Sequence, residues 1–72
     1  MKKELKRIIA ENLKRFRAEA HLTQKQLGLS MGYSEDTAQS RINRYEKGKR
    51  TPNSTSLDQL AEILKKPANA FF

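Results

Sequence analysis

Residues 36–47 combine hydrogen-bonding and cationic side chains at a spacing that suits one face of a helix. On a helical wheel with about 100° per residue, a set of polar side chains points away from the apolar Ile42 or flanks that direction. They are Asp36, Thr37, Ser40, Arg41, Asn43, Arg44 and Lys47. Guanidinium groups can donate two hydrogen bonds to guanine, amides pair with adenine, and hydroxyls serve either base. The face therefore suits the reading of base edges; the alternative is a polar face that only contacts solvent.

Glu46 differs from these neighbours because it lies only about 40° from Ile42 on the same wheel and so points partly inward. A carboxylate in that position needs a partner, since an unpaired buried charge is costly. Arg17, one position past the apolar Phe16, is the best candidate. The sequence therefore predicts a largely buried ion pair between Arg17 and Glu46 that orients the two helices carrying them.

A basic turn follows the same segment. Lys47, Lys49 and Arg50 surround Gly48, and Pro52 stiffens the exit. We expect this turn to offer cations and free backbone N–H groups to a phosphate. The Gly-Lys pair is not a P-loop, because no glycine stands five residues earlier and Arg50 occupies the position that requires Ser or Thr.

Composition excludes several kinds of site. The 72 residues, expected to form one domain over residues 1–72, contain no cysteine and a single histidine, His21. Disulfides, thiolate zinc sites, thiol nucleophiles and multi-histidine metal sites are therefore excluded. No nucleophile–base constellation is present, so we expect neither enzymatic activity nor a cofactor. His21 is interpreted as the residue that ends the first helix, because histidine is enriched at positive φ.

The charge balance favours a polyanionic partner. Fifteen Lys and Arg residues against eight Asp and Glu give a formal net charge of +7, which suits nucleic acid or an anionic membrane surface. No apolar run approaches the ~20 residues of a bilayer span, and no signal-peptide segment opens the chain. We expect a soluble, cytoplasmic, nucleoid-associated protein. A membrane-surface helix over residues 2–20 is disfavoured, because the core accounts for its apolar stripe and it has no Trp.

The residue types predict helices and no strands. Valine is absent while Leu and Ala dominate the apolar residues, a bias that favours helix. A first helix over residues 4–19 has an apolar stripe at helical spacing, formed by Leu5, Ile8, Ile9, Leu13, Phe16 and Ala20. A second helix covers residues 24–31 and a third covers residues 35–47. A fourth has one apolar face, formed by Leu57, Leu60, Ala61 and Leu64. A short fifth helix starts at Pro67.

Capping residues mark where the second and third helices begin. Thr23 and Gln26 have the spacing of a capping box, and Leu22 and Leu27 have that of a hydrophobic staple. Ser34 is predicted to cap the third helix, with acidic residues in its first turn where the helix dipole favours negative charge. Gly32 and Gly48 are predicted to end the two helices.

Taken together, these segments resemble the phage-repressor/Cro-type helix-turn-helix family, often called the XRE family. The resemblance runs from about Ile9 to the C-terminus and rests on a series of segments in order. They are Arg17, residues 22–27 (LTQKQL), Gly32, residues 42–52 (INRYEKGKRTP), Leu57 and residues 60–64 (LAEIL). The resemblance implies an all-α, lambda-repressor-like bundle of five helices with the helix-turn-helix in helices two and three. It also implies a sequence-specific, double-stranded-DNA-binding transcriptional regulator, most simply a repressor, with residues 35–47 as the recognition helix.

The resemblance also implies roles for individual residues. Gln24 matches a glutamine that contacts a phosphate and supports the recognition helix; the alternative is an ordinary residue inside the capping box. Gln39, Ser40 and Arg44 match the positions that contact bases, and the helical wheel adds Thr37 and Asn43 to this base-reading set. Lys49 and Arg50 match the loop that binds backbone phosphate, and the predicted phosphate-binding set also includes Gln24, Arg41 and Lys47. Arg17 and Glu46 match a structural ion pair of the family, in agreement with the helical wheel.

The chain departs from the family pattern at three places. About four extra residues stand between Gly32 and Ile42, which we expect to lengthen the third helix by one turn at its N-terminus. Gly28 stands where the family prefers Ala, which loosens the second helix by about 1 kcal/mol while permitting close helix approach. Lys66 occupies an often apolar position, so we expect looser packing at that corner.

Two questions about partners stay open at this point. Phe71 and Phe72 are candidates for a homodimer interface, but they suit equally well an internally packed Phe71 beside a loose Phe72. A module of this kind also suits a second function, that of an antitoxin-like or adaptor module whose main role is to bind another protein. The residues do not discriminate between that function and DNA binding.

Overall fold

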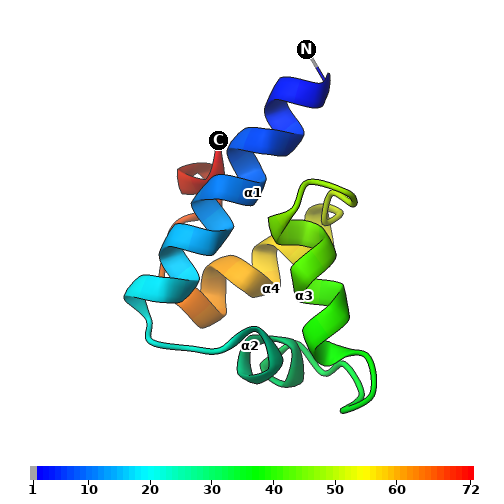
Figure 1. Ribbon diagram of the computed structural model, residues 1–72. Helices are drawn as coiled ribbons and strands as arrows, with labels where there is room; N and C mark the ends of the chain where they lie inside the picture. Colours follow the sequence, from blue (N-terminus) through cyan, green and yellow to red (C-terminus); the bar gives the residue numbers. More distant parts are fainter. Residues whose placement is uncertain (1) are drawn as a thin grey trace.

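The first helix extends beyond the body of the molecule. The structure is a computed structural model that describes residues 2–72, with side chains from residue 4 onward, and α1 spans Lys2–Glu19. Its buried side consists of Ile9, Ala10, Leu13 and Phe16. The predicted stripe is wrong at its two ends, since Leu5 is 44% exposed and Ala20 is also exposed. The N-terminal end of α1 projects past the other helices (Figure 1), which agrees with the exposure of Leu5 near the start of this helix.

The second helix begins as its sequence predicts. α2 spans Gln24–Ser30, after His21 has ended α1 with a φ of 58°. The Gln26 backbone N–H donates to Thr23 Oγ1 at 3.0 Å, and the Thr23 N–H donates to Gln26 Oε1 at 2.8 Å, so the capping box is confirmed. α2 ends one residue earlier than predicted, with Met31 as its C-cap.

The third helix is shorter than predicted. α3 spans Ala38–Glu46, and residues 35–37 form a turn outside it. Ser34 does not cap a helix with its side chain: its hydroxyl lies 2.9 Å from that of Thr37, and its carbonyl accepts from the Ala38 N–H at 2.8 Å. The extra residues before α3 are thus used in a turn and do not lengthen the helix.

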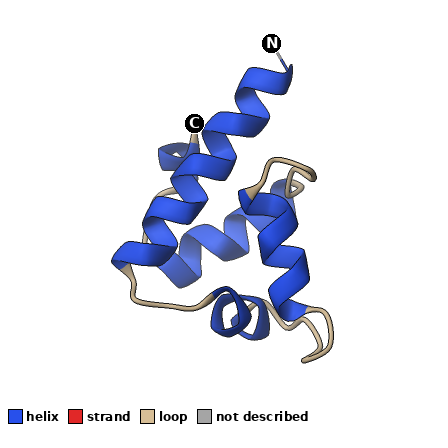
Figure 2. Ribbon diagram, viewed as in Figure 1, coloured by secondary structure: helices blue, strands red, loops and turns tan. Residues whose placement is uncertain are grey.

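The last elements complete an all-helical chain. α4 spans Ser54–Leu64 and is capped by Asn53, whose Oδ1 accepts from the Ser56 N–H at 2.8 Å. The predicted fifth α-helix is a single 3₁₀ turn, η1, over Ala68–Phe71, with Pro67 at its N-cap. Residues 2–72 therefore form four α-helices and one 3₁₀ turn, without a strand (Figure 2). None of these helices combines the length and the apolar character that a bilayer-spanning helix requires.

Phe71 belongs to the core. Its side chain is fully buried and meets the ring of Phe16 edge-on, with 5.2 Å between the ring centroids. Asn12 Nδ2 donates to the Phe71 carbonyl at 2.8 Å, which fastens η1 to α1. Phe71 is therefore not available for a dimer interface, whereas Phe72 is 59% exposed.

Lys66 makes two contacts at the corner that was expected to pack loosely. Its ammonium group lies 4.9 Å from the centroid of the Phe16 ring and 3.3 Å from Glu19 Oε1. The aliphatic stem and the cation–π contact replace the apolar residue at this position. An open hollow of about 550 Å³ nevertheless remains at this corner, lined in part by Phe16, Glu19 and Lys66, so the expectation of looser packing holds in part.

Candidate functional site

One side of α3 is buried in the core, and the opposite side is exposed to solvent. Ala38, Ile42 and Tyr45 lie in the core, as the wheel predicts. The exposed side chains are Gln39, Ser40, Arg41 and Arg44, followed by Lys47 at the C-cap. The helix thus presents a row of hydrogen-bonding groups that none of the other helices covers.

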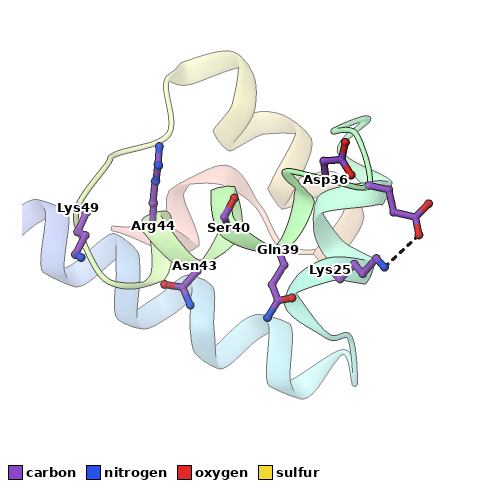
Figure 3. Close-up of a pocket in the computed structure, with 8 residues that line it drawn as sticks. Lys25, Asp36, Gln39, Ser40, Asn43, Arg44 and Lys49 are labelled. Carbon is purple, nitrogen blue, oxygen red and sulfur yellow. Dashed lines mark hydrogen bonds and ion pairs between the residues drawn. The ribbon is translucent and has the colours of Figure 1, made fainter.

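An open hollow of about 500 Å³ runs along this face. It is lined by Lys25, Glu35, Asp36, Gln39, Ser40, Asn43, Arg44 and Lys49. In Figure 3, Arg44 and Ser40 extend from one side of α3, Gln39 and Asn43 from the other, and Lys49 comes from the loop that follows. The structure therefore gathers four of the five predicted base-reading residues on one surface; the fifth, Thr37, is the exposed N-cap of the same helix.

The ion pair between Arg17 and Glu46 lies beneath this surface. Arg17 Nε is 2.5 Å from Glu46 Oε2, and Arg17 Nη2 donates to Glu46 Oε1 at 3.1 Å. The side chains are 17% and 4% exposed, and the hydrogen bond to Glu46 raises the pKa of Arg17 above its ordinary value. Arg17 Nη1 also donates to the Leu22 carbonyl at 2.8 Å. The pair therefore joins α1 to the C-terminal end of α3 and to the segment that enters α2.

Gln24 connects this pair to the exposed face. Its Nε2 donates to Glu46 Oε1 at 3.0 Å, and its Oε1 accepts from Asn43 Nδ2 at 3.4 Å. Both amide side chains are half-buried. Gln24 thus supports α3 directly, and the Asn43 amide already has one protein partner before any ligand arrives.

The N-terminal end of α3 is held by short-range hydrogen bonds. The Thr37 hydroxyl pairs with that of Ser34, and Ser40 Oγ donates to the Thr37 carbonyl at 3.1 Å. Lys25 Nζ lies 3.2 Å from Glu35 Oε1, which neutralises one of the two acidic residues in the turn. Asp36 forms no ion pair among the residues whose side chains are described, so its exposed carboxylate remains at the edge of the hollow.

The backbone N–H groups of the turn after α3 were expected to bind a phosphate, and the structure contradicts this expectation. The N–H groups of residues 47–50 all donate to backbone carbonyls of α3, at 2.9 to 3.3 Å. Gly48, at a φ of 71°, allows the chain to turn back and close these bonds. The amides are therefore not free for a phosphate, and only the exposed side chains of Lys47, Lys49 and Arg50 remain for that task.

Tyr33 is a site residue that the sequence reading missed. The Arg41 guanidinium stacks over its ring, 4.3 Å from the centroid, which orients a side chain predicted to bind phosphate. The Tyr33 hydroxyl lies 3.2 Å from that of Tyr45. Burial, with a smaller effect from this hydrogen bond, raises the pKa of Tyr33. Tyr33 precedes the turn and Arg41 lies in the helix, so no single helical periodicity relates them.

Comparison with known families agrees with this geometry. The family model HTH_3, described as helix-turn-helix, matches residues 13–71. The chain belongs to this helix-turn-helix family. It is a family of XRE-type DNA-binding transcription regulators and not one of enzymes. α2 and α3 are the two helices of the motif, and a turn joins them. No curated protein matches the chain.

Proposed function

We propose that this helix-turn-helix protein is a transcriptional repressor that binds double-stranded DNA sequence-specifically, with α3 in the major groove. The observation that carries the proposal is the exposed polar face of α3, held in place by Gln24 and by the Arg17–Glu46 pair. A major groove about 12 Å wide admits an α-helix. Repression needs only tight binding at a site that overlaps a promoter, and the same activity would place the protein on chromosomal DNA.

Arg44 is the main base reader in this proposal. Its exposed guanidinium lies beside Ser40 and carries the two-donor geometry that matches guanine O6 and N7. Gln39, Ser40 and Thr37 contribute shorter hydrogen-bonding groups nearer the start of α3. Asn43 reads a base by exchanging its 3.4 Å bond to Gln24 for one to DNA.

Cations around this face hold the DNA backbone. Lys47, Lys49 and Arg50 reach phosphates through their side chains, and Arg41 does so from its position over the Tyr33 ring. Gln24 joins them through an amide that already supports Glu46. If about four cations neutralise phosphates, log K against log[salt] falls with a slope of roughly −3.6.

The test uses a duplex selected from a random pool and a scrambled duplex of equal composition. We expect Arg44→Ala to weaken binding to the selected duplex by about 1–3 kcal/mol while leaving the scrambled duplex little changed. Lys49→Ala, the matched control, should weaken binding to both alike. Equal losses on both duplexes for Arg44→Ala would contradict its role as a base reader.

Dimerisation on a two-fold operator is part of the same proposal. Phe72 is 59% exposed and Leu5 is 44% exposed. On the helical wheel Leu5 lies about 20° from Asn12, the residue that holds η1, so it is on the side of α1 that faces the C-terminus. Sedimentation with DNA should show two chains per operator, and Phe72→Ser should lower the stoichiometry or weaken binding cooperativity. An unchanged dimer in Phe72→Ser would remove Phe72 from the interface.

A further inference from the structure

Charges on α1 are segregated around the helix. On a wheel of about 100° per residue, Lys6, Arg7 and Lys14 fall within about 100° of one another, on the side of Ala10. Glu4, Glu11 and Glu19 occupy the next sector of the wheel. All six side chains are exposed. Arg15 is the one cation among the described α1 side chains that lies in the acidic sector.

The cationic side of α1 adjoins the loop that follows α3. A hollow of about 360 Å³ between them is lined by Lys6, Arg7, Ala10, Glu11, Lys47 and Gly48. A Cβ placed on Gly48 would lie 4.0 Å from Ala10 Cβ and 4.0 Å from the Lys6 carbonyl oxygen, so the loop approaches α1 at contact distance. Three cations and one acid from two separate elements thus meet at one place.

The packing of the fold does not account for the positive charges of Lys6 and Arg7. The family match begins at Leu13, so Lys6 and Arg7 lie outside the matched segment. Neither side chain forms an ion pair among the described side chains. Glu11 is the one carboxylate in the lining of the hollow, so the three cations outnumber it, and an anion bound beside them would reduce their mutual repulsion.

We propose that Lys6 and Arg7, together with Lys47, bind a DNA backbone phosphate beyond those reached by Lys49 and Arg50. The start of α1 then extends the DNA footprint along the backbone on the side where α3 ends. The proposal rests on the proposed function, since it requires α3 to lie in the groove. It assigns no base contact to α1, so it concerns affinity and footprint length and not the choice of sequence.

The experiment compares two charge-matched variants of the full chain. Lys6→Gln with Arg7→Gln removes the patch, and Arg15→Gln with Lys65→Gln removes two exposed cations elsewhere. Gln supports helix almost as well as Lys or Arg, and circular dichroism checks that both variants keep their helices. Each variant lowers the formal net charge from +7 to +5. Binding to the selected and scrambled duplexes is measured across a salt series, and hydroxyl-radical footprints are recorded.

We expect the patch variant to flatten the slope of log K against log[salt] by about one unit, because one phosphate contact contributes about 0.9. Affinity should fall by the same factor on both duplexes, and protection should disappear only at one outer edge of the footprint. The control variant should keep the wild-type slope and footprint.

Two results overturn the inference, and they are distinguishable. If the wild-type chain binds the selected duplex but the two variants share one slope and one footprint, Lys6 and Arg7 contact no phosphate and the proposed function stands. If the wild-type chain binds no duplex at modest ionic strength, the proposed function fails first and the inference fails with it.

Discussion

Gly28 of α2 lies so close to Ala38 of α3 that no side chain fits between them. A Cβ on Gly28 would lie 2.5 Å from the Ala38 carbonyl oxygen and 2.7 Å from the Ala38 Cβ. Real Cβ atoms do not approach backbone atoms this closely, so the two helices could not keep this separation with any other residue. Gly28 therefore fixes how α3 sits on α2 and, through it, where the exposed face points.

Gly28→Ala should destabilise the protein. The substitution gains about 1 kcal/mol of helix propensity, but we expect the forced separation of α2 and α3 to leave a net loss of about 1–3 kcal/mol. The measurement is urea unfolding followed by circular dichroism. Ser30→Ala, at an exposed position of the same helix, is the control and should be neutral or slightly stabilising. A more stable Gly28→Ala protein would show that the two helices are not in this contact.

Glu46→Ala should lower the free energy of unfolding more than most single substitutions. It leaves the Arg17 guanidinium largely buried without its partner, which costs about 3–5 kcal/mol. The double variant Arg17→Met with Glu46→Leu removes both charges and should recover most of that loss. Unfolding free energies of the single and double variants provide the check. If Glu46→Ala loses less than the double variant, the pair is not acting as a buried charge pair.

Stability should fall at alkaline pH because of Tyr33. Its pKa is raised in the folded protein, above the ordinary value of about 10, so ionisation is harder in the folded chain than in the unfolded one. The resulting stability is complete below pH ~10 and is lost as pH rises toward the folded pKa, by at most about 1.4 kcal/mol per pH unit. Unfolding free energies between pH 8.5 and about 11 should show a flatter profile for Tyr33→Phe. Parallel profiles would assign the alkaline loss to other groups.

Asp36→Asn should strengthen DNA binding. The exposed carboxylate lies at the edge of the hollow beside α3 and has no ion-pair partner among the described side chains. A like-charge contact with a phosphate is worth about 1 kcal/mol at 4 Å in water, so removing it should raise affinity several-fold at low salt. Glu62→Gln, an exposed change on α4, is the control. Weaker binding by Asp36→Asn would mean that the carboxylate accepts a hydrogen bond from the DNA.

Sequence reasoning succeeded where one local pattern determines the outcome. The capping box at Thr23 follows from two residues three positions apart, and the inward turn of Glu46 follows from the period of one helix. The exposure of Ser40 and Arg44 follows from the same wheel. Each of these features needs only the geometry of a single element.

Sequence reasoning failed where the hydrogen-bonding groups of a segment can be satisfied in two different ways. Ser34 followed by acidic residues has the pattern of a helix start, yet the same hydroxyl is satisfied by Thr37 in a turn. The amides after α3 could bind an anion or close the helix, and Gly48 makes the second solution available. Leu5 and Phe71 have similar hydrophobicity, and only the packing of η1 against α1 decides which of the two is buried.

The contact between Phe71 and Phe16 also determines when this unit can fold during synthesis. The Asn12 bond to the Phe71 carbonyl joins residues 59 positions apart, and the ribosome adds residues at about 5–20 per second. α1 is synthesised first, but its packing is complete only once Phe71 covers Phe16. The nascent chain therefore carries an incompletely covered apolar side of α1 for several seconds of synthesis.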